Sequence, residues 1–306
     1  MPKAIRYSEI FYSFQGEAEL AGKPSVWLRF FGCNLECNGF GQMDPTNPAT
    51  YVLPYASFDI SKVKRIEDLP VWETGCDSSY SWSAKYKDLV HTESVEAICD
   101  RIVDQMRSAS NPLGLFVHPV TGQDAQLCFT GGEPMMWQTS MIEIVRELTR
   151  RNNGPRTITV ETNATKALKP ELKDFINDEY TAQDGGARWH WAMSPKLWTV
   201  AGEKDAVKDD VIFSYLTDSF SSGILKFVCN GSKECWGELE EHVDRLQRKF
   251  GAEGHYAPDV WIMPVGATKD AQEHSTVADI AMEAMRRGFM VATRNHCYVF
   301  GNVVGK

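Results

Sequence analysis

The sequence predicts an α/β protein built around a parallel sheet, and three observations support this fold class. Short runs rich in β-branched and aromatic residues recur along the chain, amphipathic helical patterns separate several of them, and polar motifs follow some of the runs directly. The predicted strands are residues 25–31, 126–130, 157–161, 189–193, 223–229, 259–263 and 289–293. Strands that alternate with helices imply right-handed crossovers, so the sheet is either doubly wound or curled into a full or partial barrel.

Two of the helices between these strands are evident from the spacing of their apolar residues. In both segments the apolar side chains recur at a helical period, which places them on one face of a helix. They are Val95, Ile98, Ile102 and Met106 in the first segment and Leu239, Val243, Leu246 and Phe250 in the second. Thr92 is the predicted N-cap of the first helix, because its hydroxyl can accept a hydrogen bond from a free backbone N–H.

Polar motifs stand where three of the predicted strands end. Residues 131–134 (Gly-Gly-Glu-Pro) follow the strand at 126–130, residues 161–163 (Glu-Thr-Asn) end the next strand, and residues 194–196 (Ser-Pro-Lys) follow the strand at 189–193. The carboxyl ends of parallel strands meet at one edge of a sheet, where ligands bind in such folds. We therefore expect these motifs to form one shared site.

The segment 38–75 breaks the alternation of strands and helices. It contains four prolines and scattered aromatic residues without a clear period, which is typical of a long loop or a small subdomain. No internal repeat or interdomain linker is evident elsewhere in the chain. We therefore expect residues 1–306 to form a single domain with an insertion at 38–75.

The composition limits the classes of function. A formal net charge of −9 and a pI near 5.4 argue against a protein that coats nucleic acid, because phosphate binding needs clustered Lys and Arg. No apolar run approaches the roughly 18 residues of a membrane-spanning helix, and the first residues contain no signal-peptide core. We therefore expect a soluble, cytosolic protein with a small-molecule substrate.

Three of the eight cysteines are candidate metal ligands. Eight cysteines are too few for a disulfide scaffold in a chain of this length, so grouped cysteines indicate metal or redox chemistry. Cys33 and Cys37 follow a predicted strand, and their spacing alone also fits reduced structural thiols or part of a zinc site. With Cys76 they would leave one iron of a four-iron cluster free for an external ligand. We expect buried or incidental thiols at Cys99, Cys128, Cys229, Cys235 and Cys297, which lack paired spacing.

The order of the motifs along the chain resembles the 7-carboxy-7-deazaguanine synthases, a family of radical S-adenosylmethionine (SAM) enzymes. The motifs are residues 14–17, 25–35, 76–78, 130–134, 161–163, 194–196, 263–266 and 296–305. The family closes its cysteine motif compactly, as Cys-x3-Cys-x2-Cys or a moderately expanded version, whereas residues 38–75 separate Cys37 from Cys76 here. Loop-closure entropy grows only logarithmically with length, so this insertion permits a shared cluster. Cys76 is followed by Asp-Ser, where the family has Asp-Thr.

The resemblance implies a partial (β/α) barrel of the radical SAM type and a four-iron, four-sulfur (4Fe–4S) cluster on Cys33, Cys37 and Cys76. In the similar enzymes the reduced cluster passes an electron to SAM, and the resulting 5'-deoxyadenosyl radical removes hydrogen from C6 of 6-carboxy-5,6,7,8-tetrahydropterin. The ring contracts with loss of ammonia to 7-carboxy-7-deazaguanine, a carbon–nitrogen lyase reaction of queuosine and related 7-deazapurine biosynthesis. The resemblance also implies a flavodoxin or ferredoxin as electron donor and a homodimer.

SAM contacts follow from the same resemblance. Gly132 and Glu133 would receive the methionine end of SAM, because glycine lets the backbone come close and a carboxylate accepts from the ammonium. Without the cysteines, this motif also fits an ordinary turn from strand to helix. Further contacts would come from Gly75, Asp77, Ser194, Pro195, Lys196, Met263, Pro264, Val265 and Gly266. The last stretch departs from the family, whose Gln and Asp are replaced here by Met263 and Gly266.

The resemblance also assigns a magnesium ligand and a substrate pocket. Ser78 stands where the family has a threonine that binds Mg²⁺, although a serine here also fits a turn or an N-cap. The implied substrate contacts are Phe14, Gln15, Gly16, Arg29, Thr130 and His296. Arg29 suits the substrate carboxylate because a guanidinium and a carboxylate can pair bidentately. The structural alternatives are an exposed strand arginine and, for His296, a packed final strand and turn.

Three other functions fit part of these observations. Another radical SAM enzyme, such as an activase that removes hydrogen from a glycine of a partner protein, would use the same cluster. Residues 15–17 and 77–78 favour the pterin enzymes over it. A non-catalytic zinc or iron–sulfur protein would use the cysteines for folding. A relative that has kept the fold and lost turnover is the third alternative.

Overall fold

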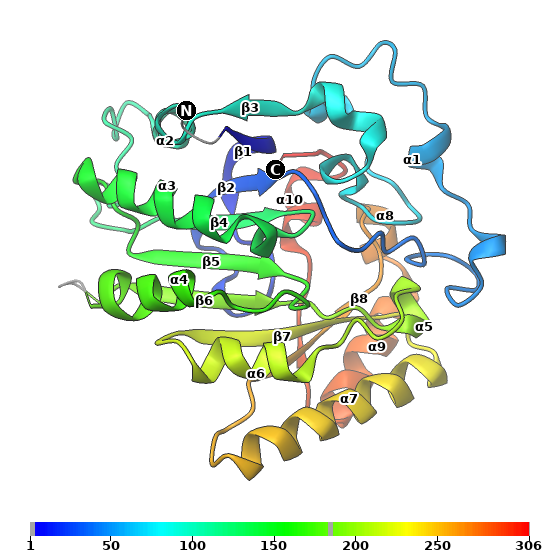
Figure 1. The fold of residues 1–306 in the computed structure, drawn as a ribbon. Helices are drawn as coiled ribbons and strands as arrows, with labels where there is room; N and C mark the ends of the chain where they lie inside the picture. The colour runs from blue at the N-terminus through cyan, green and yellow to red at the C-terminus, as the bar shows by residue number, and fades with distance from the viewer. Residues whose placement is uncertain (1–3, 183–185, 306) are drawn as a thin grey trace.

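The computed structural model of the protein describes residues 4–182 and 186–305. Within them, nine strands form one sheet in the order β3-β1-β2-β4-β5-β6-β7-β8-β9 (Figure 1). They are β1 (Ile5–Phe14), β2 (Pro24–Phe30), β3 (His91–Glu93), β4 (Gln126–Gly131), β5 (Thr157–Thr162), β6 (Arg188–Met193), β7 (Ser222–Cys229), β8 (Val260–Pro264) and β9 (Met290–Val291). Strands β2 and β4 to β9 run parallel, whereas β1 is antiparallel to both β2 and β3. The predicted α/β fold with a mostly parallel sheet is confirmed.

The helices follow the predicted alternation. They are α1 (Pro54–Ser57), α2 (Val95–Met106), α3 (Gln138–Arg150), α4 (Pro170–Asp174), α5 (Trp198–Ala201), α6 (Asp209–Thr217), α7 (Lys233–Ala252), α8 (Lys269–Gln272), α9 (Ser275–Arg286) and α10 (Asn295–Phe300). In Figure 1, α3, α4 and α6 lie in front of the sheet and the C-terminal segment with α10 lies behind it. The predicted N-cap of α2 was wrong: Ser94, not Thr92, accepts from the N–H of Ala97 (3.3 Å), because Thr92 still pairs within β3.

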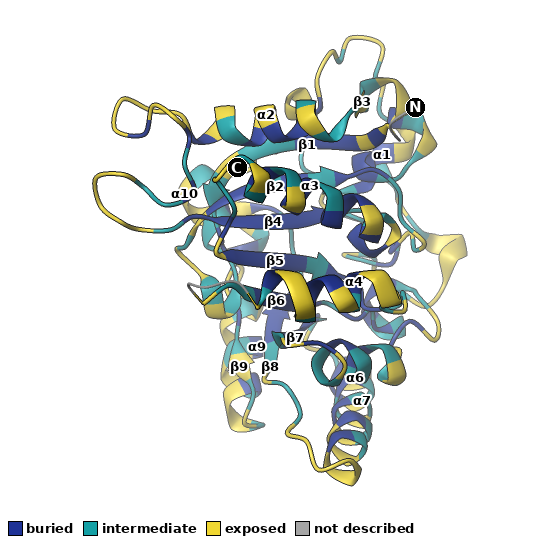
Figure 2. Ribbon diagram, turned by 60° about the vertical axis from the view of Figure 1, so that its left-hand side comes forward, coloured by how far each residue is buried: buried dark blue, intermediate teal, exposed yellow. Residues whose placement is uncertain are grey.

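Each central strand has an apolar face and a polar face. In β7, Leu225, Phe227 and Cys229 belong to the main hydrophobic core, and Lys226 points to the opposite side because side chains alternate along a strand. The corresponding core residues of β2, β4, β5 and β6 are Val26, Leu28, Phe30, Leu127, Phe129, Ile158, Val160, Trp189, Trp191 and Met193. Figure 2 shows β4 and β5 as buried along most of their length and the outward faces of α3 and α4 as exposed. The helices in front of the sheet therefore cover its apolar face.

The polar face of the sheet is also buried and is held together by side-chain hydrogen bonds. Gln126 Nε2 donates to Ser25 Oγ (2.9 Å), and Thr159 Oγ1 donates to Gln126 Oε1 (2.8 Å). All three side chains are fully buried, where an unpaired polar group would be costly. The same face continues toward the carboxyl ends of the strands, so polar residues further along them are directed to a common interior.

The segment 38–75 contains only short elements and folds back on itself. It holds α1 and single turns of 3₁₀ helix at Pro48–Thr50 and Ile66–Asp68. Near its ends, the N–H of Gly75 donates to the carbonyl of Phe40 (2.7 Å), so the two ends lie side by side. A second, smaller hydrophobic cluster is formed by Tyr55, Ile66, Leu69, Trp72, Tyr80, Tyr86 and Val304. The segment thus packs on the chain that follows it and on the C-terminal tail.

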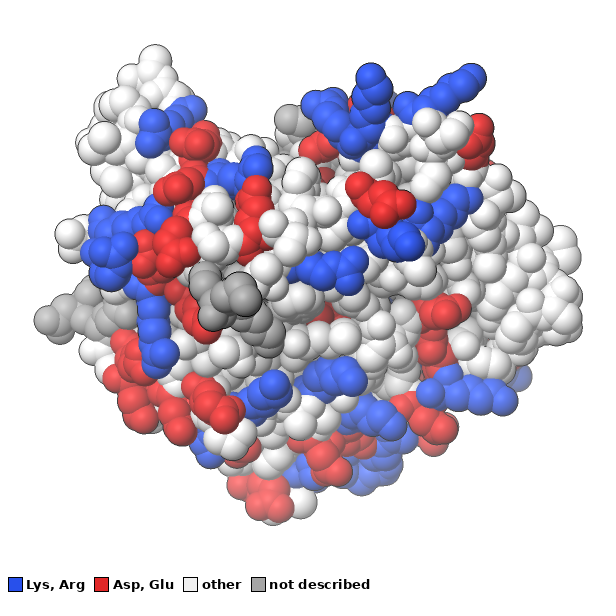
Figure 3. All heavy atoms as spheres, turned by 45° about the horizontal axis from the view of Figure 1, so that its top comes forward, with Lys and Arg blue, Asp and Glu red and all other residues white. Residues whose placement is uncertain are grey.

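Among the described residues, no helix is both long and apolar enough to cross a membrane. Figure 3 shows Lys and Arg interspersed with Asp and Glu over the visible face, without a broad area of positive charge. Such a face does not have the clustered cations that phosphate binding needs. This agrees with the formal net charge of −9.

Candidate functional site

A cavity of about 290 Å³ lies at the carboxyl ends of the parallel strands. Side chains on the polar face of the sheet line it, together with the loop that follows Cys76 and the C-terminal segment. Its volume lies near the lower end of small-molecule sites, roughly 300–1,000 Å³. The three predicted strand-end motifs meet here, through Gly131, Gly132, Glu161, Thr162, Asn163, Ser194 and Lys196.

The three candidate cluster ligands, Cys33, Cys37 and Cys76, all line this cavity. Cys33 follows β2 after a turn at Gly32, whose N–H donates to the carbonyl of Ser81 (2.7 Å). That bond ties the loop after β2 to the segment that follows Cys76. Because the intervening segment also closes on itself, the long separation in sequence does not keep Cys76 away from the other two.

Burial favours the protonated form of the three thiols. Burial raises the pKa of Cys33 to about 12 and also raises the pKa values of Cys37 and Cys76, whereas the Lys196 ammonium acts in the opposite direction on Cys33 and Cys37. Thiols in such surroundings become ligands when a metal replaces their protons. Within residues 4–182 and 186–305, no three His, Cys, Asp or Glu side chains converge as ligands of one ion. A four-iron cluster would take each thiolate on a different iron, so this finding concerns sites for a single ion only.

Position 132 must be glycine because two loops approach each other closely there. A Cβ at this position would lie 2.6 Å from the carbonyl carbon of Gly32 and 2.8 Å from the Cβ of Cys33. Only glycine leaves room for the loop that carries Cys33. The Gly-Gly backbone therefore forms the cavity wall beside the first cysteine.

Glu133, predicted to accept from the ammonium of SAM, is fully buried beneath this wall. Its carboxylate accepts from the hydroxyl of Thr162 (2.6 Å) and from the N–H groups of Asn163 (2.8 Å) and Met135 (2.9 Å). Burial raises the pKa of this carboxyl despite those bonds. Glu133 is not among the residues that line the cavity, so in this structure it holds β5 to the Gly-Gly turn.

The other predicted SAM contacts divide into two groups. Asp77, Ser194, Lys196 and Met263 line the cavity, and the Lys196 ammonium donates to the Ser194 hydroxyl (2.9 Å). The residues that line the cavity do not include Gly75, Pro195, Pro264, Val265 or Gly266. The structure thus brings one part of each predicted stretch to the cavity.

All six predicted substrate contacts line the cavity: Phe14, Gln15, Gly16, Arg29, Thr130 and His296. Gly16 and His296 are in close contact, because a Cβ on Gly16 would collide with Nδ1 of the imidazole. The N–H of Asn295 donates to the carbonyl of Gly16 (2.9 Å). Burial, followed by the charge of Arg294, lowers the pKa of His296 to about 4, so this imidazole is neutral near pH 7.

Arg29 is held by one edge of its guanidinium. Its Nε donates to Oε1 of Glu9 (2.6 Å), and the hydroxyl of Tyr80 donates to the same oxygen (3.1 Å). The guanidinium lies near the rings of Tyr80 and Phe11, with its carbon 5.6 and 6.0 Å from the centroids. Within the described part of the chain the two Nη groups have no hydrogen-bond partner. They are therefore available to an anion in the cavity.

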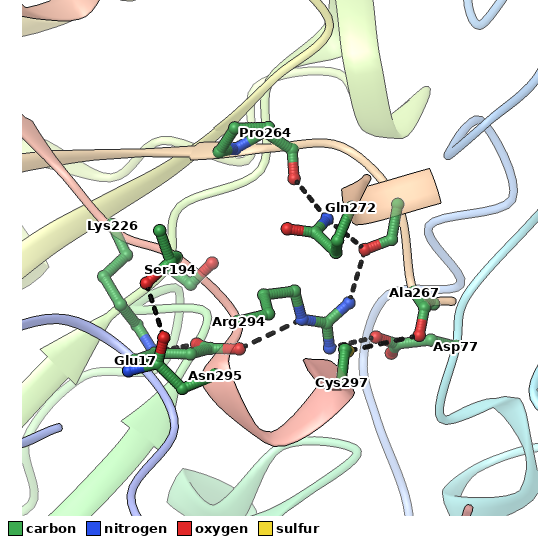
Figure 4. A network of polar contacts seen from close by, with 12 residues as sticks. Glu17, Asp77, Ser194, Lys226, Pro264, Ala267, Gln272, Arg294, Asn295 and Cys297 are labelled. Carbon is green, nitrogen blue, oxygen red and sulfur yellow. Dashed lines mark hydrogen bonds and ion pairs between the residues drawn. The ribbon is translucent and has the colours of Figure 1, made fainter. Parts of the chain in front are cut away.

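A chain of ion pairs lines the cavity, and Figure 4 shows its members Lys226, Glu17, Arg294 and Asp77. The Lys226 ammonium contacts Glu161 (2.7 Å) and Glu17 (2.8 Å), and Arg294 contacts Glu17 (3.2 Å) and Asp77 (3.0 Å). Three carboxylates and two cations thus join β5, β7, the loop after β1, the segment after Cys76 and the start of α10.

The pKa values of this network follow from its pairing. Burial alone would raise the pKa of Glu17, but the charges of Lys226 and Arg294 hold it well below its usual range. Burial alone would lower the pKa of Lys226, but the carboxylates of Glu161 and Glu17 raise it. Glu17 and Lys226 are therefore both ionised near neutral pH.

Neither Lys226 nor Arg294 was predicted from the sequence to be functional, and Glu17 and Glu161 were named only as parts of motifs. One signal for Lys226 was present, since a lone lysine interrupts the apolar run of β7 and is 3% exposed. A charge at such a position needs a buried partner. Arg294 had no comparable signal, because its partners lie far away in sequence.

The five remaining cysteines are all buried, as predicted. Although their spacing in the sequence is not paired, the Sγ atoms of Cys229 and Cys235 lie 3.3 Å apart in the structure. The turn between β7 and α7 brings them together although their spacing gave no such indication. Cys297 lines the cavity, and its thiol donates to the carbonyl of Ala267 (3.6 Å).

Comparisons with known proteins agree on one family of relatives. The chain is 25% identical over 303 residues to the 7-carboxy-7-deazaguanine synthase of Pyrobaculum aerophilum, a match that covers 99% of this chain and 97% of the relative. It is 26% identical over 308 residues to the enzyme of the same name from Halobacterium salinarum, covering 96% and 89%. Among solved structures it resembles QueE from Escherichia coli with a TM-score of 0.52 and 15% identity, covering 96% of this chain and 95% of that one. No family model matches the chain.

Proposed function

The chain is a homologue of the 7-carboxy-7-deazaguanine synthases over nearly its full length, and we propose that it is a radical SAM enzyme with the activity of that family. In this proposal it converts 6-carboxy-5,6,7,8-tetrahydropterin to 7-carboxy-7-deazaguanine and ammonia, as a carbon–nitrogen lyase of 7-deazapurine biosynthesis. The observation that supports it best is the presence of Cys33, Cys37 and Cys76 in one cavity with all six predicted substrate contacts.

The donor set of the cavity fits a 4Fe–4S cluster. Cys33, Cys37 and Cys76 supply three thiolates, which leaves one iron for the amino and carboxylate groups of SAM. When bound, the cluster and SAM supply a one-electron cleavage that yields a hydrogen-abstracting radical. Lys196 would offset part of the negative charge of the thiolates, since its ammonium already acts on Cys33 and Cys37.

The remaining predicted SAM contacts are retained as part of the proposal. The backbone at Gly132, with Ser194 and Met263, would contact SAM from the cavity wall. Glu133 would receive the ammonium only if its carboxylate gave up part of its present bonding, and otherwise it positions the Gly-Gly turn. The outlying positions Gly75, Pro195, Pro264, Val265 and Gly266 would act through the backbone that supports their neighbours.

The substrate would lie on the polar face of the sheet. Arg29 would pair with the pterin carboxylate through its two Nη groups, because Glu9 and Tyr80 fix the opposite edge. Gln15 and Glu161 would face the amino and ring N–H groups of the pterin, since a carboxylate and an amide oxygen both accept. Neutral His296 would cover this pocket from the C-terminal segment.

Ser78 would contribute one oxygen to Mg²⁺. Its hydroxyl lines the cavity, and its neighbour Asp77 is already paired with Arg294. Mg²⁺ keeps several waters and often takes oxygens from its substrate. Magnesium would therefore be held between the serine hydroxyl, waters and the substrate carboxylate.

The larger features of the proposal follow the same resemblance. Residues 1–306 would form one radical SAM domain whose sheet is a partial barrel, with residues 38–75 as an insertion in the cluster-binding region. A flavodoxin or ferredoxin would supply the electron, and two copies of the chain would form a homodimer.

Mass spectrometry of an anaerobic reaction tests the proposed function. Reconstituted protein, SAM, a reductant, Mg²⁺ and 6-carboxytetrahydropterin should yield 7-carboxy-7-deazaguanine. Accumulation of 5'-deoxyadenosine without this product would preserve the radical SAM assignment and exclude the substrate. Absence of both compounds in the presence of an intact cluster would favour a relative without turnover.

A further inference from the structure

Glu203 contacts the loop that carries two of the cluster cysteines, although it does not line the cavity. It lies just after α5, and its Oε1 accepts from the N–H groups of Glu36 (2.8 Å) and Cys37 (2.6 Å). Hydrogen bonds from backbone N–H to a carboxylate are charge-assisted and stronger than neutral ones. One side chain from a distant element thus holds two successive peptide groups of the cysteine loop.

The backbone at Cys37 needs such support. Cys37 has a φ of +53°, in the left-handed region that residues with a side chain rarely adopt. Such a conformation persists only where the surrounding structure imposes it. The Glu203 carboxylate holds the N–H of this residue, so it acts directly on the strained position.

A second contact holds the next residues of the loop to the same element. The N–H of Gly39 donates to the carbonyl of Ala201 (3.0 Å). A Cβ at Gly39 would lie 2.6 Å from the carbonyl carbon of Ala201, so the two backbones are in direct contact. The loop is therefore packed backbone against backbone on the end of α5.

The element that carries Glu203 is itself fixed to α7. Glu238 accepts from the N–H groups of Trp198 (2.8 Å) and Thr199 (2.9 Å), which are free donors at the start of α5. The Thr199 hydroxyl also donates to this carboxylate (2.6 Å). A rigid path thus runs from α7 through α5 to the cysteine loop.

We propose that Glu203 is a positioning residue for the iron–sulfur cluster, which fixes the Cys37 backbone and keeps the reduction potential of the cluster low. This inference rests on the proposed function. Backbone N–H groups that donate to cluster sulfur raise the potential, and nearby negative charge lowers it. By accepting the N–H groups of Glu36 and Cys37, the carboxylate withholds them from the cluster, and its own charge acts in the same direction.

Two variants separate the contact from the charge. Glu203→Gln keeps an oxygen that can accept the two N–H bonds and removes the charge, so it should bind the cluster normally and shift the midpoint potential upward. Glu203→Ala removes both, and iron per chain after anaerobic reconstitution should fall at least twofold. Asp205→Asn is the matched control: it makes the same charge change on an exposed residue without a side-chain contact in the described structure, and asparagine tolerates the φ of +54° there.

Iron analysis and a redox titration followed by electron paramagnetic resonance test the proposal. A residue that only stabilised the fold would change the yield of protein but not the midpoint potential of Glu203→Gln. Equal potentials for Glu203→Gln and Asp205→Asn would overturn the proposal, as would full iron content in Glu203→Ala. If Glu203→Ala does not fold, the potential of Glu203→Gln decides alone. A wild-type protein that binds no cluster would instead overturn the proposed function, and this inference with it.

Discussion

Cys76 is far from Cys33 and Cys37 in the sequence, and only the folding of the chain brings it to the same cavity. Its removal therefore tests whether it is a ligand of the cluster. Cys76→Ala should leave the protein folded and abolish formation of 5'-deoxyadenosine from SAM, since one iron would lose its thiolate. Cys99→Ala, a change at a fully buried cysteine of α2, should retain SAM cleavage. The measurement is chromatography of the quenched anaerobic reaction. Normal SAM cleavage by Cys76→Ala would remove this residue from the cluster.

His190 makes stability depend on pH in a defined direction. It is 1% exposed, and burial lowers its pKa to about 4 from a usual value of 6.5. Between these pH values the unfolded chain binds a proton that the folded chain refuses, so stability falls as pH falls from 6.5 toward 4. At pH 5 the loss due to this group is about 2 kcal/mol relative to pH 7.

The His190 prediction is measured by urea unfolding of the wild type and His190→Asn at pH 7 and pH 5. All other titrating groups are common to both proteins, so the wild type should lose about 2 kcal/mol more than the variant between the two pH values. Equal losses would show that the folded protein accepts the proton at His190.

At the scale of elements, β7 carries the cation that pairs with two largely buried carboxylates. Lys226→Met should destabilise the protein by about 3 kcal/mol, because Glu161 would lose the ammonium that it contacts and Glu17 would keep only Arg294. Lys269→Met removes a lysine from an exposed pair with Glu273 (3.6 Å) and should change stability by less than about 1 kcal/mol. Urea unfolding at pH 7 measures both. Equal effects of the two substitutions would mean that water stabilises the carboxylates of the network.

The contact between Gly16, in the loop after β1, and His296 of α10 predicts an effect on substrate binding. Gly16→Ala should displace His296, because the added Cβ collides with its ring. A misplaced pocket wall should raise the KM for 6-carboxytetrahydropterin by roughly tenfold or more, while the spectrum of the cluster stays unchanged. Gly237→Ala adds a methyl group where no atom lies within 4 Å and should leave the KM unaltered. An unchanged KM in Gly16→Ala would show that His296 does not form the substrate pocket.

The central strands could be predicted from the sequence because buried parallel strands are short, apolar and separated by helical patterns. β1 and β3 were not predicted. They pair antiparallel at one side of the sheet, and they contain charged residues such as Arg6 and Glu93 among other residue types. The strand predicted at 289–293 is reduced to Met290–Val291, which pairs only with β8. β3 and β9 are the edge strands and have one neighbour each, so their sequences carry a weaker hydrophobic signal. β1 pairs on both sides, but its charged Arg6 and Glu9 interrupt the apolar pattern.

Across the whole molecule, the cavity was more predictable than the contacts within it. Motifs at the carboxyl ends of parallel strands had to meet at one edge, and all six proposed substrate contacts lie there. The pairing of Arg294 with Glu17 and Asp77, and of Glu203 with the cysteine loop, joins residues remote in sequence. Such contacts depend on how the chain returns over the sheet, which neither composition nor periodicity specifies.

The central claim is that Cys33, Cys37 and Cys76 hold one cluster with an iron open to SAM. Electron paramagnetic resonance of the anaerobically reconstituted and reduced wild-type protein, recorded with and without SAM, tests it most directly. We predict the signal of a reduced 4Fe–4S cluster and a change in its g-values when SAM is added, because SAM would bind the fourth iron. A colourless, zinc-loaded protein, or a cluster signal that SAM does not alter, would contradict the claim.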